Sequence, residues 1–190
     1  MEKSRSKLTT VRIPEDLHRI IQQEAREENI GFNTVVNRLL RKHVEWDRFA
    51  NRFGMVSLSR ETIVSLLDSI DDEKIEEIAK SLVPKIKEMV DFWFQSSDLE
   101  SWIKFLTLIS KYGGEGTVFA NTSGPQTKIH LRHGLGSKWT RLFAVPIETV
   151  LSEMGVKSEV QKRENSLTIV IPTQHVKQKQ AKRKSSQKTN

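Results

Sequence analysis

The chain has 190 residues, of which 36% are hydrophobic and 29% are charged. This length allows a small module plus one further domain, or one compact domain. Cysteine is absent from the sequence, which excludes a disulfide framework, a cysteine nucleophile and a thiolate metal site. No apolar run reaches the ~18 residues of a membrane helix, and the first residues lack an apolar signal core. We therefore expect a cytoplasmic protein with no membrane partner.

The net charge of +7 is concentrated at the two ends of the chain. Residues 1–53 hold 11 Lys and Arg against 8 Asp and Glu, and residues 54–172 hold 14 against 16. Residues 173–190 hold 6 basic residues and no acid. Basic ends are typical of nucleic-acid-binding proteins, although a solubilising tail has the same composition.

The first element that we expect is a short strand. Residues 8–14 read LTTVRIP, a β-branched run with a period of two that ends at a proline. In this register Val11 and Ile13 point to one face, and Thr10 and Arg12 point to the other.

Two amphipathic helices are predicted after this strand. The first spans residues 15–28, with Leu17, Ile20, Ile21 and Ala25 on its buried stripe. Gly31 breaks the pattern, and Asn33 is a suitable N-cap for the second helix, which continues to about Gly54. The stripe of the second helix consists of Val36, Leu39, Leu40, His43 and Val44.

Residues 57–112 have a helical pattern throughout. Ser59 is expected to cap a short helix, and a longer one that contains Pro84 should be kinked or split there. Residues 97–100, Ser-Asp-Leu-Glu, match a capping box for a third helix, which stops at Gly113.

The remaining pattern predicts a β-β-α-β-β unit. Strands are expected at residues 117–120 and 128–133, a helix capped by Ser137 follows, and residues 159–163 and 167–171 form a hairpin. The fold class is thus mostly α with an α+β C-terminal part. We expect a DNA-binding domain over 1–54, a helical segment over 57–112, an α+β unit over 115–172 and a disordered basic tail over 173–190; residues 57–172 form either one domain or two.

A lone strand is unstable in water, and its unpaired edge favours antiparallel pairing with a second copy. The segment LTTVRIPEDLHRIIQQEAREENIGFNTVVNRLLRKHVE resembles ribbon-helix-helix repressors of the Arc, MetJ and CopG kind, over about residues 7–45. The resemblance implies a β-α-α module that forms an intertwined homodimer. Its two-stranded ribbon would lie in the major groove of double-stranded DNA.

The resemblance also assigns site residues. The base-reading positions of the family fall on Leu8, Thr10 and Arg12. The family's phosphate clamp falls near Asn33 and Thr34, and we also expect a phosphate contact from Lys7. Arg12 can donate two hydrogen bonds to a guanine, and Thr10 can bond to a base edge or touch a thymine methyl. Leu8 stands where a polar reader is more usual, so it contacts a thymine methyl or the strand starts later.

No pattern predicts an enzyme, a metal site or a cofactor. His130 and His133 are three residues apart on an expected strand, so they face opposite sides of it. Residues 134–137 before a helix lack the lysine and the spacing of a P-loop. Lys128, His130 and Arg132 share one strand face, which is a solvated basic face or an anion-binding one. Trp93, Trp102 and Trp139 lie on helical stripes and are expected to pack in the core.

The sequence therefore favours a sequence-specific transcription regulator that acts as a homodimer or a higher oligomer. Residues 57–172 would oligomerise or sense a signal, and the sequence does not identify their small-molecule or protein ligand. One alternative is the DNA-binding antitoxin of a toxin-antitoxin pair, although antitoxins usually carry a short tail in place of so long a segment. Another is an architectural or RNA-binding protein in which the basic tail dominates binding.

Overall fold

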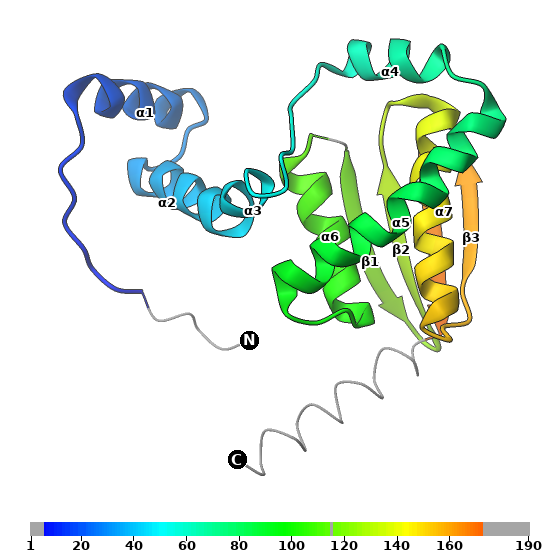
Figure 1. Cartoon of the computed structure of the whole chain (residues 1–190). Helices are drawn as coiled ribbons and strands as arrows, with labels where there is room; N and C mark the ends of the chain where they lie inside the picture. The colour runs from blue at the N-terminus through cyan, green and yellow to red at the C-terminus, as the bar shows by residue number, and fades with distance from the viewer. Residues whose placement is uncertain (1–5, 115, 173–190) are drawn as a thin grey trace. The chain divides into compact units, whose positions relative to one another are not determined.

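The computed structural model describes residues 6–114 and 116–172, and it divides the chain into two compact units. One unit extends to Arg48 and the other begins at Phe49 (Figure 1). Within the described ranges, no helix has both the length and the apolar character needed to cross a membrane. The basic segment 173–190, which the sequence predicts to be disordered, lies outside the described residues.

The N-terminal unit begins with helices, and the predicted ribbon-helix-helix start is wrong. Residues 6–14 form no strand, and the first regular element is helix α1 (Glu15–Glu27). A strand needs a neighbour for its backbone hydrogen bonds, and the four strands of the described residues all pair with one another in the C-terminal unit. The alternation of apolar and polar residues over 8–13 is typical of a strand, but no neighbouring strand among the described residues pairs with this segment.

Helix α2 (Phe32–Lys42) follows α1 after a short turn in which Asn29 has φ of 54°. Its N-cap is Gly31, in extended conformation, so the predicted cap at Asn33 is wrong by two residues. The second helix runs on toward Gly54, as predicted, with a change of helix type within it. A π-helical turn, η1 (His43–Asp47), and a short helix, α3 (Arg48–Ala50), continue α2, and Gly54 with φ of 65° ends the segment.

The described residues of the C-terminal unit form four further helices and a sheet. Their bounds are α4 (Arg60–Asp68), α5 (Asp72–Phe94), α6 (Leu99–Tyr112), β1 (Thr117–Ser123), β2 (Gln126–Arg132), α7 (Gly136–Glu153), β3 (Glu159–Arg163) and β4 (Ser166–Pro172). The predicted β-β-α-β-β order is the order observed.

The helix caps and helix breaks observed in this unit agree only in part with those predicted from the sequence. The Ser59 hydroxyl accepts a hydrogen bond from the Thr62 amide and caps α4, as predicted. Helix α6 is capped by Asp98, one residue later than expected from the capping box, and α7 begins before Ser137 with no side-chain cap. Pro84 lies inside α5 without splitting it into two helices.

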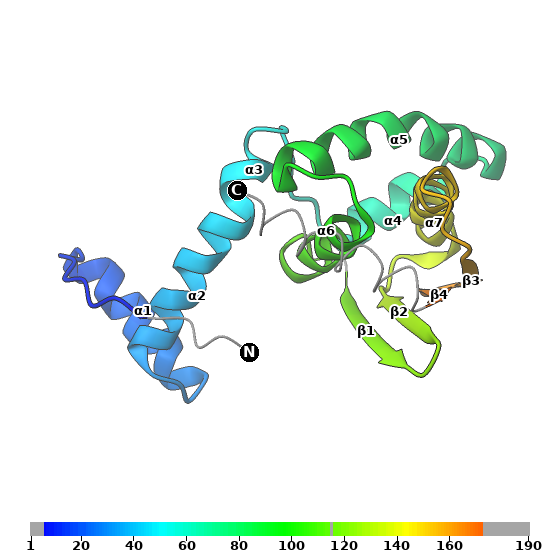
Figure 2. The same ribbon diagram turned by 90° about the horizontal axis from the view of Figure 1, so that it is seen from below.

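The sheet has the order β1-β2-β4-β3, and every neighbouring pair is antiparallel. Figure 2 shows the helices of this unit on one side of the sheet. Alternate residues of β2 and β4 face them, and Ile129 pairs with Ile169 and Leu131 with Leu167 at the centre. These side chains join residues of α6 and α7 in the main apolar core. Each such buried side chain stabilises the fold by about 1.5–3 kcal/mol relative to an exposed one.

Hydrogen bonds of His133 link the end of β2 to the start of α7 and to the β3–β4 turn. Its Nδ1 accepts a hydrogen bond from the Leu135 amide at 3.2 Å, and its Nε2 lies 2.9 Å from the Thr140 hydroxyl. The Thr140 hydroxyl in turn donates to a turn carbonyl, that of Arg163 at 2.9 Å or of Glu164 at 3.0 Å. An Nδ1 that accepts from an amide carries no proton, so this network requires a neutral ring with its proton on Nε2.

The stability of the protein should therefore decrease in acid through His133. Burial, and secondarily the charge of Arg60, lowers the pKa of His133 in the folded chain. Protons then bind the unfolded chain first, so the contribution is complete above the unfolded pKa of about 6.5 and is lost as the pH falls below it. Denaturant unfolding of the wild type and of His133→Gln at about pH 7.5 and about pH 5.5 measures this effect.

We expect the wild type to lose more unfolding free energy between these two pH values than His133→Gln loses. His130→Gln is the matched control, because the His130 side chain makes its hydrogen bond to the Thr168 side chain on the neighbouring strand. This variant should keep the pH dependence of the wild type. An identical pH dependence in the wild type and His133→Gln would contradict the assignment.

Candidate nucleic-acid interface

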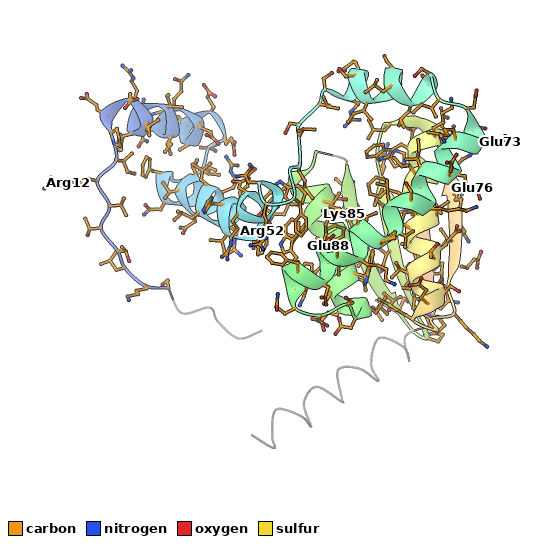
Figure 3. The ribbon with its side chains drawn as sticks, in the orientation of Figure 1. Arg12, Arg52, Glu73, Glu76, Lys85 and Glu88 are labelled. Atoms are coloured by element: carbon orange, nitrogen blue, oxygen red, sulfur yellow. The ribbon has the colours of Figure 1, made fainter. Side chains whose placement is uncertain are left out.

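The N-terminal segment (residues 6–14) exposes the side chains that the sequence assigns to DNA contacts. Lys7, Leu8, Thr10 and Arg12 are all exposed, and Leu8 is 97% exposed. Figure 3 shows Arg12 projecting away from the ribbon. No strand pairing among the described residues fixes the orientation of side chains in this segment. The sequence predicted that Val11 is buried on the face opposite Arg12, but Val11 is 71% exposed in the single chain, so that prediction is wrong there.

Asn33 and Thr34 lie in the first turn of α2, and both are exposed. No side chain caps this helix, and its first turn contains no acidic residue. The free amides and the helix dipole give such an end a partial positive charge, which suits a phosphate. Both residues thus lie at the start of α2, and their contact with phosphate stays a prediction.

Arg38 joins the two helices of the N-terminal unit, which the sequence analysis did not anticipate. Its guanidinium donates to both oxygens of Glu28, at 2.6 and 2.8 Å, and also contacts Glu24. The hydrogen bonds from Arg38 lower the pKa of Glu28, and those to Glu28 and Glu24 raise the pKa of Arg38. The signal in the sequence was two carboxylates four residues apart at the C-terminal end of α1, Glu24 within the helix and Glu28 at its C-cap, followed after a short turn by one arginine.

Large apolar side chains remain exposed on both helices. They form what we call the apolar stripe, with exposures between 45 and 59%: Leu17 and Ile20 on α1, Leu39 and Leu40 on α2, and Val44 on η1. The sequence predicted that these residues are buried. Within α1 and α2 only Ala25 and Val35 are buried, although the rings of His18 and Phe32 also meet between the helices, with centroids 4.8 Å apart. The stripe therefore lacks a cover within its own unit.

Two groups of cations can be distinguished among the described residues of this unit. Arg38, Arg41 and Lys42 pair with acids of the same unit. By contrast, four exposed cations form no ion pair with another described residue: Lys7, Arg12, Arg19 and Arg26. The unpaired positive charge thus lies on the N-terminal segment and on α1.

His130 lies on β2 and His133 directly follows it, and the two side chains have separate partners. His130 Nδ1 lies 2.9 Å from the Thr168 hydroxyl on the sheet face, whereas His133 is buried in the network with Thr140. Over residues 6–114 and 116–172, no group of three or more His, Asp or Glu side chains could hold a metal ion. Two of the three tryptophans expected in the core, Trp93 and Trp102, are buried, and Trp139 is half-buried.

Comparison with models of known protein families gives no match, and comparison with curated proteins gives none either. What the protein does is therefore inferred from its own residues. The strongest candidates are the N-terminal segment, the two helices after it, and the surfaces that they leave exposed.

Arg38→Ala should loosen the packing of α1 on α2, because it leaves Glu24 and Glu28 without their shared cation. Amide hydrogen exchange of the full chain measures this effect at the α1 residues, which we expect to exchange faster than in the wild type. Arg19→Ala is the matched control, since Arg19 is an exposed arginine without an ion pair among the described residues. Equal exchange in the two variants would show that the Arg38 contacts do not hold the helices together.

Proposed function

We propose that this protein is a sequence-specific DNA-binding protein that acts as a homodimer and regulates transcription. The observation that carries the proposal is the apolar stripe, which lies in the same small unit as the unpaired cations. The exposed apolar stripe would be stabilised by contact with an apolar partner surface. The unpaired cations would be stabilised by contact with an anionic partner. A β-ribbon is no part of this proposal.

A second copy of the chain is the partner that best fits the apolar stripe. Two copies related by a two-fold axis present the same surface to each other, so one set of residues serves both sides. The side chains of the stripe are about half-exposed in one chain. Covering the rest would contribute on the order of 1 kcal/mol for each side chain in each copy.

Such a dimer would present two N-terminal segments to one DNA duplex. Lys7 and the α2 N-terminus near Asn33 and Thr34 would contact phosphates, which positions the protein without reading the sequence. Arg12 and Thr10 would read base edges, and Leu8 would contact a thymine methyl. Extended N-terminal segments that enter a groove beside a helical domain are a known mode of DNA binding.

The other two functions are favoured less by the structure. Residues 49–172 include a sheet and helices around their own apolar core, whereas an antitoxin usually carries a short and partly disordered tail. An architectural or RNA-binding role would rest on residues 173–190. In that case the full chain would bind random DNA and RNA as tightly as a selected duplex, at the same salt concentration.

Leu40→Glu should convert the full chain from a dimer to a monomer. The substitution puts a charge into the centre of the proposed contact, where it would lose its water without gaining a partner. Sedimentation velocity at micromolar concentration measures the change. DNA affinity should fall with it, because a monomer engages only half of the duplex site.

Leu66→Glu is the matched control for this variant. Leu66 is a similarly exposed leucine, but it lies on α4 in the C-terminal unit. It should leave both the dimer and the DNA affinity unchanged. A wild-type chain that sediments as a monomer, or a Leu40→Glu variant that stays dimeric, would refute the proposed interface.

Arg12→Ala should reduce affinity for a duplex selected from genomic fragments by roughly ten- to a hundredfold, while random DNA is affected far less. The expected loss is that of a bidentate contact with guanine, about 1–3 kcal/mol. Fluorescence anisotropy with both duplexes at one salt concentration gives the two affinities.

Arg132→Ala removes the same charge from the sheet of the C-terminal unit and should leave the ratio of the two affinities unchanged. If Arg12→Ala lowered both affinities equally, Arg12 would contact phosphate only. If neither affinity changed, the N-terminal segment would not take part in DNA binding.

A further inference from the structure

An apolar cavity lies within the C-terminal unit, between the helices α5, α6 and α7. Its volume is about 220 Å³. Its wall includes Met89 from α5, Trp102 and Phe105 from α6, and Trp139, Phe143 and Ile147 from α7. Helix α5 contacts both α6 and α7, and all three helices lie on one side of the sheet in Figure 2.

The cavity has a buried floor and a half-buried rim. Met89, Trp102, Phe105 and Ile147 are each at least nine-tenths buried. Trp139, by contrast, is half-buried, as is Phe143, and their ring centroids lie 4.9 Å apart. A small molecule can therefore reach the floor past the aromatic side chains of α7.

The cavity opens at its half-buried rim, and it is larger than the voids that close packing leaves in protein interiors. Interiors are packed as densely as organic crystals, and voids larger than a water molecule are rare. An apolar cavity of about 150 Å³ stays dry and accepts benzene. Water has no ionised or hydroxyl side chain to bond to in this wall, because every lining residue is apolar or aromatic. The space is thus suited to an apolar molecule of one or two rings.

Two wall residues carry an indole N–H, Trp139 at the half-buried rim and Trp102 at the buried floor, and the donor of interest is that of Trp102. This donor is buried and has no hydrogen-bond acceptor among the described residues. A buried donor without a partner destabilises the fold, and most buried donors in proteins are paired. A ligand with one acceptor atom could pair with it, whereas an ionised ligand would lose its hydration without compensation.

We propose that this cavity is a binding site for a small uncharged molecule with a one- or two-ring apolar body and a single hydrogen-bond acceptor. The body fills the space between α5, α6 and α7, and the acceptor pairs with the Trp102 N–H. A whole helix is too wide to occupy this space, because a helix is about 10 Å across with its side chains. The site is independent of DNA binding by the N-terminal unit.

Two probes of nearly equal shape test the proposal on the full chain. 2-Acetylnaphthalene carries a ketone acceptor, and 2-ethylnaphthalene replaces it with a methylene group. A ligand-detected NMR titration should show saturable binding of both probes. The ketone should bind roughly three- to tenfold more tightly, as expected for one net hydrogen bond.

Three variants locate the binding. Leu142→Trp fills the cavity from its wall and should abolish binding of both probes, whereas Leu66→Trp on α4 should not. Trp102→Phe should retain binding of 2-ethylnaphthalene and remove the preference for the ketone. Trp93→Phe, a buried tryptophan outside the cavity wall, should keep that preference.

The wild-type titration decides the proposal even if a variant fails to fold. The proposal is overturned if the wild type shows no saturable binding of 2-acetylnaphthalene, or if a folded Leu142→Trp binds it as well as the wild type does. Equal affinity of the wild type for the two probes would overturn the role of the Trp102 N–H.

Discussion

The N-terminal unit depends on one constraint, which is that its two short helices cannot bury their apolar faces against each other. Only Ala25 and Val35 are buried in α1 and α2. Helices of 13 and 11 residues are marginally stable in water without tertiary packing. The Arg38 contacts with Glu24 and Glu28 are exposed, and exposed ion pairs contribute little. The unit therefore needs a partner surface over the apolar stripe to be stable. The position of that partner would also determine how the proposed DNA-binding residues are arranged.

The C-terminal unit is built in the opposite way. Its sheet, α6 and α7 share one continuous apolar core, and His133 and Thr140 fasten the strand ends to the helix. This unit therefore has its own source of stability. The cavity beneath α5 is a departure from close packing, and a ligand there would add contacts that the unit itself lacks. The two proposed binding sites thus lie in separate units.

Much of the fold could be predicted from local patterns, and the rest depends on contacts that such patterns do not contain. Periodicity predicted α1 and the hairpin of β3 and β4 almost to their ends, because each is set by its own residues. Residues 8–13 have the composition of a strand, but a strand requires a neighbour. The stripe residues such as Leu40 have helical spacing, which indicates a face to be covered and does not say by what. Arg12 could be selected as an exposed cation, whereas the Arg38 contacts and the Trp102 cavity arise only when separate helices pack.

The central claim is that a second copy of the chain covers the apolar stripe. An isotope-filtered NOE experiment on a mixture of labelled and unlabelled full-length protein tests it directly, because it detects only contacts between different chains. We expect intermolecular NOEs to the methyl groups of Leu39, Leu40 and Val44. A mixed sample in which these methyl groups show NOEs only within their own chain would contradict the account.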